Sequence, residues 1–172
     1  LRCLVGSEMC IRDRFVNVLL GALMAWVVLK AAKLLFPRRY AWMFTALVVF
    51  LPGNVILYSY VNCDALAMCS TAIIFYSWVK AYKEGWNWTT CAVSAIGMGL
   101  CFLSYYNAYG FILTTFFFFV GTMLTDQEKA PKERWKEMIQ KGLFILVIVC
   151  VIALWWFIRN AILYLSLIHI SE

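Results

Sequence analysis

Residues 142–158 read GLFILVIVCVIALWWFI and contain no charged side chain. An α-helix rises about 1.5 Å per residue, so this stretch covers most of the roughly 30 Å of hydrocarbon in a bilayer. Lys141 precedes the stretch, and Arg159 and Asn160 follow it. The stretch therefore predicts a helix that spans a membrane and has polar groups at both ends.

Similar apolar runs fill the rest of the chain. Hydrophobic residues make up 65% of its 172 residues and charged residues 14%, whereas soluble domains contain roughly 45–50% apolar residues. This composition excludes an ordinary water-soluble domain. We predict an all-α, polytopic integral membrane helix bundle with about six transmembrane helices, at residues 15–35, 41–58, 65–79, 89–105, 109–124 and 142–158.

Two local features modify this simple pattern. Pro52 and Gly53 interrupt the second run, and a membrane helix tolerates such a break where neighbouring groups bond to the freed carbonyls. The charged segment 125–141 has an apolar stripe that includes Trp135 and Ile139, one helical turn apart. This stripe predicts a helix that lies on the membrane surface.

Both ends of the chain can be translated from one inverted DNA element. The DNA TCGGAGATGTGTATAAGAGACAG encodes residues 7–13, SEMCIRD, and its reverse complement, extended by one base, encodes residues 165–172, LSLIHISE. This element resembles an adapter used in sequencing libraries. We therefore interpret residues 1–14 and 165–172 as adapter-derived, and expect residues 15–164 to be a transmembrane helical domain that is a fragment of a larger one.

Histidine and cysteine offer little chemistry in residues 15–164. The single histidine, His169, lies in an adapter-like end, so histidine catalysis and histidine metal ligands are not expected. Five cysteines remain, without Cys-x-x-Cys spacing and mostly within apolar runs, where a thiol packs as a small hydrophobic group. They are Cys63, Cys69, Cys91, Cys101 and Cys150. Neither a zinc site nor a disulfide framework is indicated.

The basic side chains predict the orientation of the bundle. If the six helices alternate in direction, eleven of the twelve Lys and Arg residues of segment 15–164 lie on one face, and only Arg159 lies on the other. By the positive-inside rule the basic loops are cytoplasmic. We therefore expect a multi-pass protein of the cell membrane, whose positive charge contacts anionic membrane lipid and requires no nucleic-acid partner.

The predicted outer face has few polar groups, and a substrate site is expected among them. The candidate substrate-binding residues are Asn62, Asp64, Tyr105, Asn107, Arg159 and Asn160. Asp64 has two interpretations: its carboxylate caps the first turn of the third helix, or it binds sugar hydroxyls or a metal ion together with Asn62. The residues alone assign no metal ligand.

Arg159 and the turn around residue 106 also allow two interpretations each. Arg159 follows Trp155 and Trp156, so its side chain either extends to lipid phosphate at the membrane surface or binds the phosphate of a lipid-linked substrate. Tyr105 and Asn107 either line a sugar-binding pocket or belong to an interfacial aromatic belt.

Five short segments carry a resemblance to a known family. They read FVNVLLGAL at 15–23, FLPG at 50–53, SYVNCDAL at 59–66, GMGLCFLSYYN at 97–107 and WWFIRNAILY at 155–164. In this order they resemble membrane glycosyltransferases of the GT-C class, in the family 39 and protein mannosyltransferase-like group. Ser104 departs from the pattern, because relatives often have lysine there.

The resemblance implies an enzyme that transfers a sugar from a polyprenyl-phosphate donor to an acceptor on the outer face of the membrane. In this family a carboxylate in the first outer loop, usually one of an acidic pair, acts as base on the acceptor hydroxyl and positions a divalent cation. Residues 15–164 contain no such pair. The catalytic carboxylate is therefore expected upstream, and the fragment is expected to be inactive alone.

Two other classes of function stay open at this point: a multi-pass transporter or flippase, and a structural membrane protein. The transporter is less favoured, because no predicted span has an ionisable residue near its middle. Proton-coupled transport usually requires one.

The adapter interpretation predicts the sequence of the parent gene. We expect genomic DNA amplified across codons 15–164 to continue on both sides into coding sequence that differs from residues 1–14 and 165–172. Upstream of Phe15 it is expected to encode an outer loop with paired acidic residues. Genomic DNA that keeps the inverted element at both ends would contradict the interpretation.

Overall fold

The computed structural model describes residues 2–59, 64–104, 108–125 and 131–169, with side chains described between residues 14 and 162 of those ranges. The regular elements in these ranges are all α-helices, which confirms the predicted all-α membrane helix bundle. They are α1 (Arg2–Leu35), α2 (Arg38–Val49), α3 (Pro52–Ser59), α4 (Asp64–Glu84), α5 (Trp88–Leu103), α6 (Tyr109–Thr125) and α7 (Pro131–His169).

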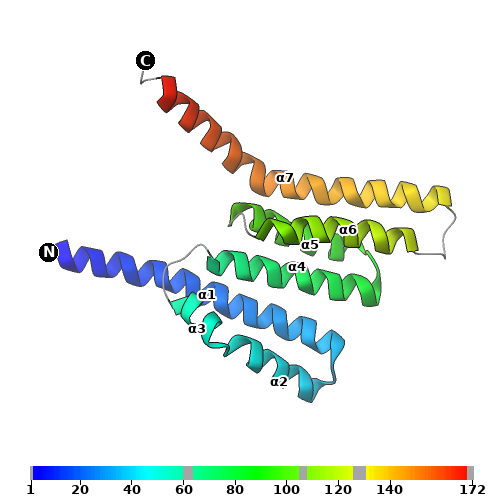
Figure 1. Ribbon diagram of the computed structural model, residues 1–172, viewed down its shortest axis with the longest axis horizontal. Helices are drawn as coiled ribbons and strands as arrows, with labels where there is room; N and C mark the ends of the chain where they lie inside the picture. Colours follow the sequence, from blue (N-terminus) through cyan, green and yellow to red (C-terminus); the bar gives the residue numbers. More distant parts are fainter. Residues whose placement is uncertain (1, 60–63, 105–107, 126–130, 170–172) are drawn as a thin grey trace.

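The helices lie side by side in a layered row (Figure 1). α1 packs against α4, α4 against α5, and α5 against α7, while α2 and α3 cover α1, and α6 lies against α4, α5 and α7. Successive helices alternate in direction, with α3 continuing the path of α2 (Figure 1). The C-terminal ends of α1, α4 and α6 therefore lie at the same end of the bundle.

That end, which we call the basic end, carries most of the basic side chains. Those described there are Lys30, Lys33, Arg38, Arg39, Lys80, Lys83, Lys132, Arg134, Lys136 and Lys141. Two of them lie over tryptophan rings: Lys30 Nζ is 5.3 Å from the ring centroid of Trp26, and Lys33 Nζ is 5.5 Å from that of Trp42. The common location of these cations agrees with alternating helices; which face is cytoplasmic stays a prediction.

Fewer helices can span a membrane than the six that the sequence predicts. Among the described residues, Arg14–Leu35, Asp64–Glu84 and Pro131–Ile162 are long and apolar enough, and the α2–α3 pair, bent by 60°, makes a fourth if it counts as one span. α5 and α6 fall short because they contain 16 and 17 residues. At 1.5 Å per residue they extend only about 24–26 Å, against roughly 30 Å of hydrocarbon.

The predicted break at Pro52 is confirmed and has its own hydrogen bond. Pro52 begins α3 and has no N–H, so the carbonyl of Val48, four residues earlier, lacks its helical donor. The side chain of Asn54 replaces that donor, because its Nδ2 donates to the Val48 oxygen at 2.7 Å. Asn54 is 9% exposed. The bend can therefore lie in hydrocarbon with the Val48 carbonyl bonded.

Small side chains let α5 approach both α4 and α7. A Cβ atom on Gly97 would lie 2.9 Å from Cγ1 of Ile74 and 3.2 Å from the Ile74 backbone nitrogen, and one on Gly99 would lie 2.9 Å from Cβ of Ile152. Gly97 therefore faces α4, and Gly99 faces α7. The other small buried residues of α5 are Thr90, Cys91, Ser94, Ala95 and Cys101.

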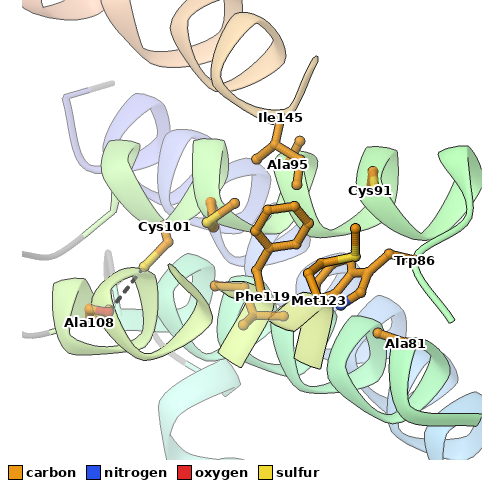
Figure 2. Close-up of a cluster of buried hydrophobic side chains, with 11 residues drawn as sticks. Ala81, Trp86, Cys91, Ala95, Cys101, Ala108, Phe119, Met123 and Ile145 are labelled. Carbon is orange, nitrogen blue, oxygen red and sulfur yellow. Dashed lines mark hydrogen bonds between the residues drawn. The ribbon is translucent and has the colours of Figure 1, made fainter. Parts of the chain in front are cut away.

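A core of buried side chains joins α4, α5, α6 and α7 (Figure 2). Trp86 lies edge to face with Phe119, with ring centroids 4.8 Å apart. Its indole Nε1 donates to Thr122 Oγ1 at 2.8 Å, and the Trp78 indole donates to Thr115 Oγ1 at 3.1 Å. Both indoles thus pack their apolar rings in the core while their N–H groups stay bonded.

The separate surface helix predicted for residues 125–141 is not formed. From Pro131 onward these residues are the first turns of α7, which continues to His169. The 39 residues of α7 correspond to about 58 Å, so its charged start extends beyond a hydrocarbon layer of roughly 30 Å. The apolar stripe was misread, because the start of a long helix and a short surface helix share the same spacing.

The adapter-like ends continue the terminal helices. α1 begins at Arg2, before the predicted start at residue 15, and α7 extends to His169. A helix can form from a translated adapter as from native sequence, so the adapter interpretation stays a prediction.

The contact at Gly97 predicts a large packing effect. Gly97→Val is expected to lower the free energy of unfolding by about 1–3 kcal/mol, because the new side chain meets the α4 backbone. Unfolding in mixed detergent micelles, followed by circular dichroism, measures this change. Gly121→Val on α6 is the matched control, since a Cβ there meets nothing within 4 Å. Equal losses in the two variants would show that the α4–α5 contact is not the cause.

The hydrogen bond at the α2–α3 bend gives a second stability prediction. Asn54→Leu keeps a side chain of similar size but leaves the Val48 carbonyl without its donor, so we expect a loss of about 1 kcal/mol in the same assay. Ser59→Ala is the control, because the exposed Ser59 hydroxyl bonds only to carbonyls of its own helix. An unchanged stability of Asn54→Leu would refute the role given to this bond.

Candidate functional site

The described candidate residues lie away from the basic end. Asp64 begins α4 at the opposite end of the bundle, and Arg159 and Asn160 lie in the second half of α7 (Figure 1). Asn62, Tyr105 and Asn107 fall outside the described residues. The structure therefore bears on half of the predicted site.

Asp64 occupies the position expected for a residue that stabilises a helix start. It is the first residue of α4, the acidic residue of its first turn, and it is partly buried. A carboxylate there stabilises the positive end of the helix dipole. This position supports the capping interpretation, and a contact with substrate stays a prediction.

Two further buried polar groups lie on helices that pack with α4. Asn17 on α1 is 6% exposed, and the hydroxyl of Tyr58 on α3 is buried with no hydrogen-bond partner among the described residues. The Tyr58 ring packs over Gly21, where a Cβ would lie 2.9 Å from the ring Cγ. Neither group was among the residues predicted from sequence. The available signal was Asn17 one turn before Gly21 in an apolar run, a spacing typical of close helix contact.

Arg159 lies beside tryptophan on an exposed stretch of α7. Its guanidinium carbon is 5.7 Å from the ring centroid of Trp156, close enough for a cation–π interaction. The ring centroids of Trp155 and Trp156 are 5.8 Å apart. This arrangement suits a cation held at the membrane surface by an aromatic belt. Arg159 is exposed, so its guanidinium is accessible from outside the bundle.

The predicted site is divided between two parts of the molecule. In Figure 1 the second half of α7 diverges from the rest of the bundle, away from the start of α4. Leu154, Phe157 and Ile162, on that part of α7, are 46–63% exposed. The described part of the structure therefore does not place Asp64 and Arg159 in one pocket.

Cysteine and acidic side chains form no evident metal centre in the described residues. No group of three or more His, Cys, Asp or Glu side chains there could hold a metal ion. Cys69, Cys91 and Cys101 are buried free thiols. Cys101 Sγ donates to the Ala108 carbonyl oxygen at 3.3 Å, which ties the end of α5 to the start of α6 (Figure 2).

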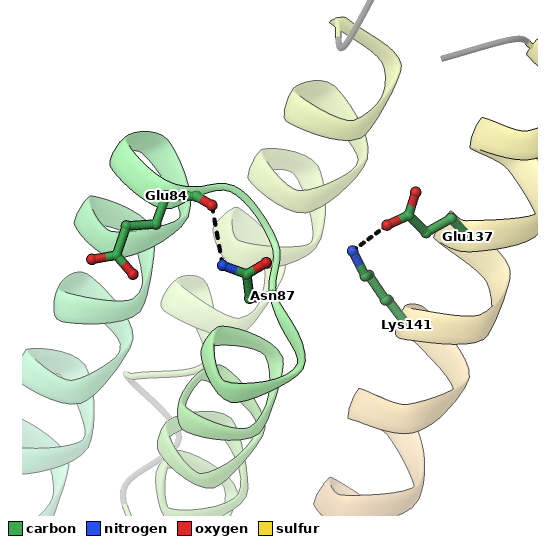
Figure 3. Close-up of polar contacts among 4 residues, drawn as sticks. All are labelled: Glu84, Asn87, Glu137 and Lys141. Carbon is green, nitrogen blue, oxygen red and sulfur yellow. Dashed lines mark hydrogen bonds and ion pairs between the residues drawn. The ribbon is translucent and has the colours of Figure 1, made fainter. Parts of the chain in front are cut away.

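Polar contacts at the basic end hold its connections together (Figure 3). Lys141, which is buried, forms an ion pair with Glu137 one turn earlier on α7. Asn87, directly before α5, donates its Nδ2 to the Glu84 carbonyl oxygen at 3.2 Å. The ion pair lies within α7, and the Asn87 bond lies within the turn between α4 and α5.

Comparison with known protein families places this helical membrane bundle in the class of membrane glycosyltransferases of the GT-C kind. Residues 4–157 match the dolichyl-phosphate-mannose-protein mannosyltransferase family, and the chain belongs to that family. The match covers most of the chain and confirms the resemblance drawn from its short motifs. Comparison with curated proteins and with solved structures found no match.

Proposed function

We propose that the protein takes part in the transfer of a sugar from a polyprenyl-phosphate donor to an acceptor hydroxyl on the outer face of the cell membrane. Membership of the mannosyltransferase family over residues 4–157 is the observation that carries this proposal. The grouping of basic side chains supports an orientation with the basic end in the cytoplasm. Asp64 and Arg159 would then face the outside.

The proposed roles of these residues follow from their chemistry. The Arg159 guanidinium presents a planar fork of donors with a permanent charge, which suits the phosphate of the donor. Asn160 and Asp64 can bond to sugar hydroxyls, as can Asn62, Tyr105 and Asn107. Membrane lipid around the bundle would hold the polyprenyl chain, so the donor reaches the protein from within the bilayer.

In the proposed reaction the acceptor oxygen forms a bond to the anomeric carbon of the sugar, and the bond from that carbon to the phosphate oxygen breaks. Polyprenyl phosphate leaves with the bonding electrons, and the acceptor proton passes to a carboxylate base. We propose that this carboxylate belongs to a part of the parent protein outside residues 15–164, where it could also position a divalent cation. Residues 15–164 would then contribute binding and orientation.

Transfer assays on the product of the uninterrupted gene test this proposal. Membranes that contain it are incubated with radiolabelled mannosyl-phosphoryl-dolichol, and label in the acceptor fraction is measured. Arg159→Gln is expected to raise the KM for the donor about tenfold, since a charge-assisted bond contributes roughly 1.5–3 kcal/mol, and Arg159→Lys is expected to restore part of the loss.

The control is Arg39→Gln, which removes a cation from the basic end and is expected to leave the KM unchanged. Absence of transfer by the intact gene product would overturn the proposed function. Equal effects of Arg39→Gln and Arg159→Gln would overturn the role given to Arg159 alone.

A further inference from the structure

An apolar groove runs along the bundle between α5, α6 and α7. It has a volume of about 470 Å³ and is lined on α7 by Met138, Gly142, Ile145, Leu146 and Val149. Phe116 and Leu146 at its rim are 59% and 57% exposed, so the groove is accessible from the side, as a lipid would approach it. Its volume lies within the range of about 300–1,000 Å³ typical of ligand sites.

The groove offers an occupant apolar contacts and no free polar group. Thr115 is its one polar lining side chain. The Thr115 hydroxyl donates to the Phe111 carbonyl oxygen at 2.6 Å and accepts from the Trp78 indole at 3.1 Å. The part of a ligand that lies in the groove must therefore be an apolar chain, because nothing there compensates the desolvation of a polar group.

The groove fits within one leaflet of a bilayer. Its α7 residues run from Met138, in the charged start of the helix, to Val149, and the part from Gly142 onward covers about 10 Å of the uncharged stretch. Half of a hydrocarbon layer of roughly 30 Å is about 15 Å. A single acyl chain that hangs from a headgroup at the basic end would thus follow the groove toward the middle of the membrane.

Arg134 closes the groove at the basic end. It lies one turn before Met138 on α7, and its Nη1 donates to the carbonyl oxygen of Leu124, which lies one turn after the groove residue Val120 on α6. The bond therefore joins both helices one turn beyond the apolar lining. One guanidinium donor is engaged there, which leaves the others of its fork to bind an anion.

The charge around this closure favours an anionic headgroup. The described residues 131–141 contain four basic side chains, Lys132, Arg134, Lys136 and Lys141, and two acidic ones, Glu133 and Glu137. Lys141 and Glu137 neutralise each other as an ion pair. The other described side chains of this segment, Lys132, Arg134, Lys136 and Glu133, carry a net positive charge, which attracts an anionic lipid headgroup.

We propose that this groove is a binding site for an anionic phospholipid, with one acyl chain between α6 and α7 and the phosphate on Arg134. The site lies at the end opposite Asp64 and Arg159, so it is separate from the proposed donor site. The lipid fills the space between two helices that otherwise contact each other little, and it would fix α7 against α6.

Photo-cross-linking tests the proposal. The full chain is reconstituted in phosphatidylcholine vesicles that contain phosphatidylglycerol with a diazirine in one acyl chain, and labelled peptides are mapped after irradiation. We expect labels concentrated on the α6 and α7 residues of the groove. Arg134→Gln is expected to lower the yield about five- to tenfold through loss of the phosphate contact, and Gly142→Leu is expected to abolish the groove label by filling the space.

Two matched variants serve as controls. Lys83→Gln removes a cation from another connection at the same end, and Gly142→Ala adds a Cβ that meets Phe119 at an ordinary 3.7 Å; both should keep the wild-type yield. Labels spread evenly over all helices, equal labelling by phosphatidylcholine with the same diazirine, or displacement of the label by polyprenyl phosphate would each overturn the proposal. Because these outcomes are measured on the wild-type chain, they hold even if a variant fails to fold.

Discussion

The whole bundle depends on the close approach of α5 to its two neighbours. Lipid tails are as apolar as leucine, so helices in a membrane gain little from burying apolar surface against each other, and their association relies on packing and on hydrogen bonds between helices. Gly97 brings the α5 backbone close to that of α4, and Gly99 does the same for a side chain of α7. The layers α4, α5 and α7 follow from these two contacts, and α6 then adds the Trp86–Thr122 and Trp78–Thr115 bonds.

Much of this fold could be predicted from sequence, because its signals are local. Apolar runs indicated the helices, Pro52 indicated the break, and Asp64 indicated the start of α4. The length of α7 could not be predicted, since the same apolar spacing fits a surface helix and the first turns of a longer one. The number of spans was overestimated because α5 and α6 are apolar throughout but shorter than the hydrocarbon is thick. How such short helices pack against α4 and α7 can be seen only in the structure.

The candidate site was less predictable than the fold, and the reason is physical. Asp64 and Arg159 were selected because charge is rare on the predicted outer face, and rarity shows that a residue is exceptional without showing what it contacts. The burial of Asn17 and of the Tyr58 hydroxyl could be seen only once α1 and α3 were packed against α4. The family, by contrast, could be predicted from short motifs. Several weak matches in a consistent order along a chain are more specific than any one of them.

The gathering of basic side chains at one end of the bundle has a consequence for biogenesis. Placing one Lys or Arg at the centre of a membrane costs about 2.5–3.5 kcal/mol on insertion scales, and inverting the folded bundle would carry every basic side chain of that end through the bilayer. The barrier makes the orientation chosen during synthesis permanent. Two copies of the chain in opposite orientations therefore cannot arise by spontaneous reorientation after insertion.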